Sequence, residues 1–259
     1  MSELSLLQYS DLPKQQNYRI RVARRVRSGL FEEQKSMSDR EYAITAVQNA
    51  EQLDQAMCLV HDCYVERGFI KPIDQGKRIR IFEQSNVLST FIALDGSDVV
   101  VGTIGIVSDS DIGLPSEKFF AEEIGLIRSS GNRIIEITNL AMVPDSRGRS
   151  LFLDLSRLVI AYALSHCVDK IFIAVSPSHA SIYHSIFQFD QIGDVRTYCD
   201  ETCDSVVGMV MSMDECFARA KKMDALLGNN SFIIDLLSTK NPFIKDKSFW
   251  APTVIRYGA

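Results

Sequence analysis

Glu136 is the first residue whose type and setting could do chemistry. It stands inside the apolar run IIEITNLAMV of residues 134–143. A carboxyl group among branched apolar side chains loses hydration, which raises its pKa and suits a general base that works near neutral pH. The other interpretation is a carboxylate at a sheet edge that faces water or pairs with Arg133. Because residues two apart in a strand share a face, the run predicts one common face for Glu136, Thr138, Leu140 and Met142.

An arginine-rich turn follows this run. It consists of Arg147, Gly148, Arg149 and Ser150, and it precedes a helix that we predict over residues 150–166. Free backbone N–H groups at the start of a helix bind phosphate and similar polar groups, and two guanidinium groups add charge-assisted hydrogen bonds. The turn is therefore a candidate site for a phosphate or pantetheine group, although a solvated loop fits the same residues.

Tyr183 is the third candidate, in a short helix predicted over residues 179–187. A phenol and a thiol have comparable pKa values, so Tyr183 could protonate a leaving thiolate. The alternative is a half-buried aromatic side chain that packs on the sheet. His179 and His184 fit capping or surface positions. The sequence contains no Gly-x-Ser-x-Gly elbow, no Cys-His nucleophile pattern, no P-loop and no dinucleotide-binding fingerprint.

Strands and helices alternate around these candidates. Helical spacing of apolar residues with Asn49 as N-cap predicts the first helix, and DGSD at 95–98 predicts a hairpin. The basic segment 71–84 is predicted to be a loop. We expect strands at 42–47, 89–94, 99–107, 134–143, 170–175, 194–198 and 206–213, and helices at 50–68, 114–129, 150–166, 179–187 and 214–227. This order predicts a mixed α/β (α+β) fold with one central sheet flanked by helices.

The composition is that of a globular protein. The chain has 259 residues, of which 46% are hydrophobic and 24% charged, with a net charge of −5. Its longest apolar run, at 155–164, is too short to span a bilayer, and residues 1–14 lack the features of a secretory signal, so we expect a cytoplasmic protein without a transmembrane segment. The six cysteines form no CxxC pair and are not spaced with the four histidines as zinc ligands, so we expect reduced thiols and no metal.

The N-terminal region carries a strongly basic segment, RIRVARRVR at 19–27. One interpretation is a solvated arm. The other is a docking surface for an acidic partner, with Arg24, Arg25 and Arg27 as the contact residues. The alternation in its first half also fits a strand that is fixed to the domain.

Two segments resemble the GNAT acyltransferase superfamily. MVPDSRGRSLFLDL at 142–155 resembles its acyl-donor motif [RQ]-x-x-G-x-[GA], with Arg147 at the first position and Ser150 and Phe152 where small residues are usual. We expect Phe152 to obstruct the close approach of a coenzyme A pyrophosphate. SIYHSIFQF at 181–189 resembles the family's FY-x-x-x-GF helix, which implies that Tyr183 is the general acid and puts Gln188 in the place of the glycine.

A more detailed resemblance is to the FeeM-type N-acyl amino acid synthases, relatives of the acyl-homoserine-lactone synthases. It covers residues 42–213 and rests on segments 63–70, 114–131, 136–148 and 174–193. It implies a GNAT-like domain at 41–213 with a basic extension at 1–40 and a helical extension at 214–259. The resemblance also implies that Glu136 is the base. Asn139 stands where the lactone synthases carry an arginine, which argues against an adenosylmethionine-type substrate.

The implied reaction takes a long fatty acyl chain from the phosphopantetheine of acyl carrier protein to the α-amine of an amino acid, with no bound cofactor and no nucleic acid partner, and gives a product that partitions to the membrane. The acyl donor would lie along Leu140, Ala141, Met142 and Val143 and at the turn Arg147 to Ser150. Three alternatives remain open. They are an acyl-CoA-dependent N-acetyltransferase, an acyl-homoserine-lactone synthase, and a catalytically silent GNAT-fold binding module that docks a partner through the basic segment.

Overall fold

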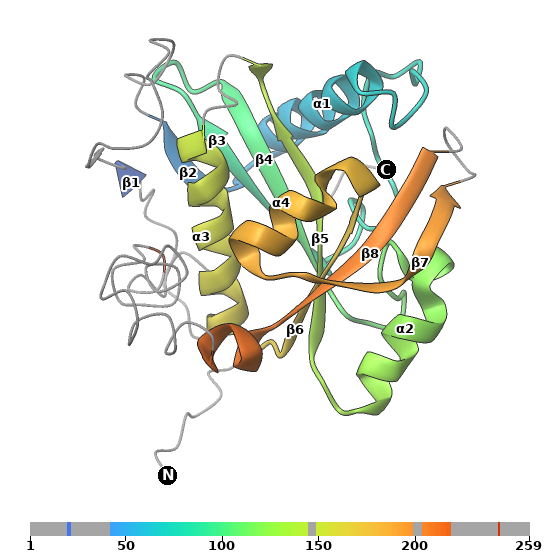
Figure 1. Ribbon diagram of the computed structural model, residues 1–259. Helices are drawn as coiled ribbons and strands as arrows, with labels where there is room; N and C mark the ends of the chain where they lie inside the picture. The colour runs from blue at the N-terminus through green and yellow to red at the C-terminus, as the bar shows by residue number, and fades with distance from the viewer. Residues whose placement is uncertain (1–19, 22–41, 145–148, 199–203, 219–242, 244–259) are drawn as a thin grey trace.

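The computed structural model describes residues 20–21, 42–144, 149–198, 204–218 and 243. They form one eight-stranded sheet in the order β1-β2-β3-β4-β5-β6-β8-β7, with helices on both faces (Figure 1). The strands are β1 Ile20–Arg21, β2 Ala43–Ala46, β3 Leu88–Leu94, β4 Val100–Ser108, β5 Ile134–Met142, β6 Lys170–Val175, β7 Asp190–Tyr198 and β8 Asp204–Ser212. The helices are α1 Ala50–Glu66, α2 Glu117–Ser129, α3 Arg149–Ser165 and α4 Pro177–Phe187. The predicted mixed α/β fold is confirmed.

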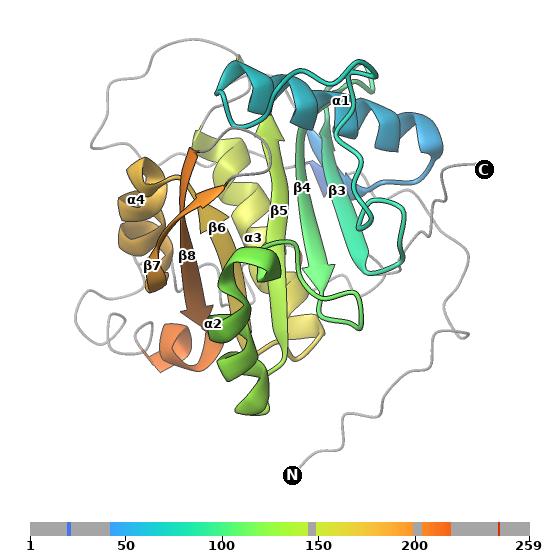
Figure 2. The ribbon, with the colours of Figure 1, turned by 90° about the vertical axis from the view of Figure 1, so that its right-hand side faces the viewer.

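One pair of neighbouring strands differs from the rest of the described sheet. β5 and β6 are parallel, whereas the other recorded pairs are antiparallel. A parallel pair needs a crossover connection, which α3 supplies. Pairing runs only from Ile134 opposite Lys170 to Ile137 opposite Ile173. Beyond this point β5 continues to Met142 while β6 leads into α4 (Figure 2), so the sheet is open between the two strands there.

The two faces of the sheet are covered by different helices. On one face, α1 packs through Met57 and Val60 and α2 packs through Phe120. On the other face, α3 buries its apolar side through residues such as Leu155 and Leu158, and α4 packs beside it (Figures 1 and 2). An apolar core therefore lies on each side of β5, with Ile135 and Ile137 facing α3 and Ile134 facing α2.

A β-bulge interrupts the alternation of β5. Thr138 lies opposite Gly105 and Ala141 opposite Thr103, so Asn139 and Leu140 share the single partner Ile104. Asn139 has a φ of 52°, in the left-handed region that asparagine tolerates better than most residues. The extra residue reverses the phase of the strand. Leu140 and Met142 therefore pack with the α3 face and Ala141 with α1, and the prediction that Leu140 and Met142 share a face with Glu136 is wrong.

The observed ends of the helices show which of the predicted helix boundaries were correct. Asn49 caps α1, accepting the main-chain N–H of Gln52 at 2.9 Å, as the sequence predicted. The second helix begins later than predicted, because Pro115 and Ser116 form a turn before Glu117. A final helical segment begins at 213, one residue before the helix predicted over 214–227, and the predicted continuation past 218 lies outside the described residues.

Parts of both predicted extensions contact this sheet and its core. Ile20 in β1 pairs with Ile44 in β2, and Phe243 is completely buried in the core that contains α3. Arg24, Arg25 and Arg27, the hypothetical docking residues, lie outside the described residues. None of the helices in the described ranges is long and apolar enough to cross a bilayer.

Candidate functional site

A cavity of about 550 Å³ lies where β5 and β6 separate. Because the sheet is open there, residues from both of its faces line the same space. Ser116, Glu136 and Thr138 line it from the face covered by α1 and α2. The apolar side chains of α3 and α4 line it from the other face, among them Leu155, Val159, Ile160, Ile182, Ile186 and Phe187. One cavity thus combines a polar end with a long apolar end.

Glu136 is the acid at the polar end. Its side chain is 3% exposed and both carboxylate oxygens are held by Ser116, whose main-chain N–H donates to Oε2 at 2.9 Å and whose hydroxyl donates to Oε1 at 2.7 Å. Burial raises the pKa of Glu136 to about 7, against the lowering effect of the Ser116 hydrogen bonds and of the charge on Arg80. The interpretation of Glu136 as a solvated carboxylate at a sheet edge is wrong, because β5 lies between β4 and β6.

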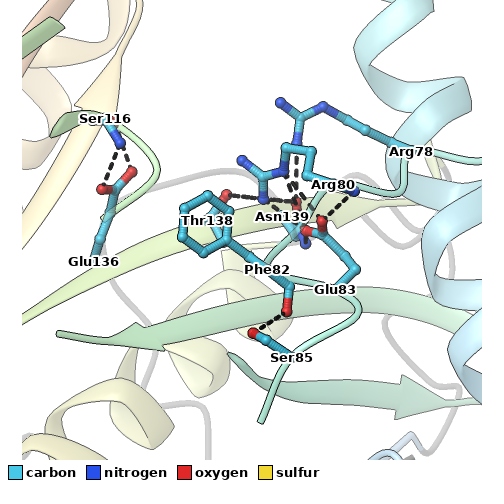
Figure 3. A network of polar contacts seen from close by, with 9 residues as sticks. All are labelled: Arg78, Arg80, Phe82, Glu83, Ser85, Ser116, Glu136, Thr138 and Asn139. Carbon is cyan, nitrogen blue, oxygen red and sulfur yellow. Dashed lines mark hydrogen bonds and ion pairs between the residues drawn. The ribbon is translucent and has the colours of Figure 1, made fainter. Parts of the chain in front are cut away.

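A network of buried polar side chains lies beside Glu136, towards α1 (Figure 3). Arg80 Nη2 donates to Thr138 Oγ1 at 3.1 Å and to Asn139 Oδ1 at 3.2 Å, and Arg78 Nη1 donates to the same Asn139 oxygen at 3.4 Å. The Asn139 amide donates to Glu83 Oε1 at 2.9 Å. Asn139 stands at the position where the lactone synthases carry an arginine. In this structure Arg78 and Arg80, both from segment 71–84, bond to its side-chain oxygen instead.

Segment 71–84 is a loop with turns, as predicted, and several of its side chains are fixed to the domain. Arg78 and Glu83 are buried, with 5% and 3% exposure. The ring of Tyr64 lies 5.3 Å from the Arg78 guanidinium, and the main-chain N–H of Ile73 donates to His61 Nε2 at 3.0 Å. These contacts join residues far apart in the sequence, so no local spacing indicated them.

Tyr183 lines the cavity from α4, in a cluster of aromatic rings. Its ring centroid is 6.3 Å from Phe152, 6.2 Å from Phe187 and 6.0 Å from Phe189. Tyr183 and Phe152 both line the cavity, and within the described part of the chain the Tyr183 hydroxyl has no recorded hydrogen bond. Burial raises the pKa of the phenol to about 12, so Tyr183 is a weaker acid than the sequence interpretation assumed.

Only some of the residues expected to bind the acyl donor line the cavity. Leu140, Ala141 and Met142 line the cavity on the open stretch of β5. Val143 does not, because its main-chain N–H donates to the Val101 carbonyl at 3.0 Å and so faces β4. Arg149 and Ser150 begin α3, directly beyond β5, whereas Arg147 and Gly148 lie outside the described residues.

Two further predictions concern metal and the end of α4. No group of three or more metal-ligating side chains is found within the described ranges, and Cys58 and Cys167 are free thiols there. Gln188, at the position of the expected glycine, ends α4 with a φ of 60°. The backbone is therefore in the left-handed conformation that glycine favours, although the residue is glutamine.

Comparisons with solved structures support this description of the fold. The structure of FeeM, an N-acyl amino acid synthase from uncultured soil microbes, matches with a TM-score of 0.61 and 24% identity over 69% of this chain and 94% of that one. The acyl-homoserine-lactone synthase LasI matches with a TM-score of 0.51 and 15% identity over 74% of this chain and 96% of that one. No curated protein sequence matches the chain. The fold is that of the GNAT acyltransferases.

A comparison with family models gives the more specific result. The model of the N-acyl amino acid synthase FeeM matches residues 55–212, which contain β3 to β8 and most of α1. This span includes Glu136, the arginine network and Tyr183, and with them the whole cavity lining. The match covers more than half of the sequence, so the chain belongs to the FeeM family of N-acyl amino acid synthases and is an N-acyltransferase.

Proposed function

We propose that the protein transfers a long-chain fatty acyl group from acyl carrier protein to the α-amine of an amino acid. The observation that carries the proposal is the single cavity with a buried carboxylate at one end and an apolar slot between α3 and α4 at the other. A fatty acyl chain needs an apolar slot of this kind. An amine, which is protonated in water at neutral pH, needs a base before it can attack.

In the proposed reaction the two ends of the cavity do different work. Glu136, directly or through a water molecule, takes a proton from the amine. The amine nitrogen then bonds to the thioester carbonyl carbon, while main-chain N–H groups on the open stretch of β5 stabilise the oxyanion. The C–S bond breaks, the thiolate leaves with the carrier, and the nitrogen gives its second proton to solvent. With a pKa near 7, Glu136 is substantially ionised at neutral pH and remains basic enough to accept the proton.

Tyr183 has a secondary part in this mechanism. A phenol with a pKa of about 12 gives its proton to a thiolate unfavourably, because an ordinary thiol has a pKa of about 8.5. The Tyr183 hydroxyl therefore serves chiefly as a hydrogen-bond donor to the sulfur, and solvent supplies the proton.

The choice of donor is the second part of the proposal. Ser150 and Phe152 replace the small residues of the acyl-donor motif, which disfavours the pyrophosphate of coenzyme A but not a carrier that presents pantetheine alone. The test compares kcat/KM for one acyl group on acyl carrier protein and on coenzyme A. We expect the carrier thioester to be used better, and a clear preference for the coenzyme A thioester would contradict this part of the proposal.

The test of the function itself is mass spectrometry of lipid extracts from cells that express the protein. We expect a new N-acyl amino acid, whose fragments identify both the acceptor and the acyl chain. Cells that express Glu136→Gln at the same level are the matched control and should contain far less of it. A product acylated on a polyamine or on another amine without a carboxylate would overturn the amino-acid assignment.

A further inference from the structure

The polar end of the cavity contains more positive than negative charge. Among the described residues that line the cavity, the cationic side chains are Arg67, Arg78 and Arg80, and the acidic side chain is Glu136. Glu83, behind the lining, is ion-paired with Arg80 and also ionised, so three arginines stand against two carboxylates. An anionic group on a bound substrate would therefore be attracted to this end, and the attraction is stronger in a partly desolvated cavity than in water.

Arg80 is held in a fixed orientation at this end. Its Nη2 donates to Glu83 Oε1 at 2.7 Å, its main-chain N–H donates to Glu83 Oε2 at 2.6 Å, and Thr138 and Asn139 accept from the same Nη2. The Glu83 side chain is completely buried. Burial alone would raise the pKa of Glu83, but the charge and hydrogen bonds of Arg80 hold it below its ordinary value, so Glu83 stays ionised behind Arg80.

The spacing of Glu136 and Thr138 along β5 is within the reach of an α-amino acid. Glu136 and Thr138 lie on the same face before the bulge, and residues two apart in a strand are separated by about 7 Å. Arg80 is bonded to Thr138, and its charge acts on Glu136. In a free amino acid one carbon joins the amine to the carboxylate. Each of these groups needs about 3 Å to reach a hydrogen-bond partner, so the molecule can bridge the two positions.

We propose that Arg80, flanked by Arg78, binds the carboxylate of the acceptor while Glu136 faces its amine. This assignment rests on the proposed function and makes it narrower. The acceptors are free α-amino acids, and the enzyme discriminates against amino-acid amides, amino-acid esters and simple amines. A hydrogen bond from a guanidinium to an ionised carboxylate is roughly twice as strong as one to a neutral amide, so the charge of the carboxylate favours the acid.

The experiment measures kcat/KM for the preferred amino acid and for its primary amide. Wild type should prefer the acid by about 10-fold to 100-fold, the range for a hydrogen bond to a charged group. Arg80→Gln alone would leave Glu83 buried without its cation. The informative variant is therefore Arg80→Gln with Glu83→Gln, and Glu83→Gln alone is its matched control. The double variant should bring the ratio of acid to amide close to one, whereas the control should keep the preference.

Calorimetric titration of the same amino acid and amide separates this inference from the proposed function, because it reports binding whether or not an acyl group is transferred. The carboxylate site is supported if the double variant no longer binds the amino acid while Glu83→Gln still binds it. This result would hold even if the acyl donor differs from the one proposed. Equal use and equal binding of acid and amide by wild type would overturn it. An equal loss for both acceptors in a double variant that melts normally would likewise make Arg80 a structural residue only.

Discussion

Ser116 donates to both oxygens of the Glu136 carboxylate, through its main-chain N–H at 2.9 Å and its hydroxyl at 2.7 Å. Ser116 immediately precedes α2, and neither of these donors caps that helix. One residue, twenty positions before Glu136, therefore fixes the direction in which the carboxylate points and limits how far burial raises its pKa.

Replacement of Glu136 tests the assignment of the base. Glu136→Gln keeps the shape of the side chain and removes its basicity, so kcat should fall by roughly 10²-fold to 10⁴-fold, the usual range for general base catalysis. Tyr183→Phe should have a smaller effect, because solvent can protonate the thiolate. Steady-state kinetics on both variants, with circular dichroism to verify folding, makes the comparison. Near-normal activity in folded Glu136→Gln would reduce Glu136 to a structural acid.

The pH dependence of kcat/KM should reflect Glu136 and its contact with Ser116. Activity should rise with pH through about 7, as the carboxyl group loses its proton in the free enzyme. Ser116→Ala removes the hydroxyl that favours the ionised form, so the rising limb should move to higher pH while the plateau is largely retained. A limb that stays in place would show that another group titrates there.

The stability of the protein should depend on the same ionisation. The pKa of Glu136 is about 7 in the folded state and 4.5 without the fold, so the folded state loses relative stability as pH rises through 7. Glu136→Gln removes this loss. Its free energy of unfolding should exceed that of wild type by up to about 3 kcal/mol at pH 8, and the difference should shrink towards pH 5. Urea denaturation at the two pH values measures it, and a difference independent of pH would contradict the assignment.

The end of α4 offers a test by stabilisation. Gln188 adopts a left-handed backbone, and its Oε1 is buried without a hydrogen-bond partner in the described structure. Gln188→Gly relieves both problems and should raise the free energy of unfolding by about 1 kcal/mol. Gln188→Ala is the matched control, because it removes the oxygen but keeps a β-carbon in the left-handed conformation. Equal stability of the two variants would exclude backbone strain as the cause.

The basic segment at 19–27 gives a prediction about the carrier. If it docks an acidic acyl carrier protein, replacement of Arg24, Arg25 and Arg27 by Gln should raise KM for the carrier, leave KM for the amino acid unchanged and flatten the salt dependence of kcat/KM. Ile20 pairs with Ile44, so the segment begins at the sheet edge. A triple variant with a much lower melting temperature and equal loss for both substrates would make the segment structural instead.

The order of elements could be predicted from the sequence, because it depends on local patterns. Apolar spacing marked the helices, whereas the acid among branched residues left two alternatives, a buried base and a solvated carboxylate at a sheet edge. Several boundaries were correct within a few residues for the same reason. The fold could therefore be derived from short-range order together with the motif resemblance.

The arginine network could not be predicted in this way. Arg80 and Thr138 are separated by 58 residues, and Arg78 and Asn139 by 61, so no spacing relates them. The bulge was missed for a different reason. Asparagine tolerates a positive φ but does not require it, and only the register with β4 fixes the extra residue at Asn139. Because the bulge was missed, Leu140 and Met142 were assigned to the wrong face of the sheet.

The four-residue overlap of β5 and β6 has a consequence for the kinetics of the proposed reaction. In the proposed reaction the donor and the acceptor share the one cavity past Ile137 and Ile173, which residues of both sheet faces line. Both substrates are then bound together when the acyl group moves, and no acylated enzyme intermediate is required. Initial rates measured at several fixed concentrations of either substrate should give intersecting double-reciprocal lines, the pattern of a ternary complex, whereas parallel lines would indicate that the acyl group stops on the protein.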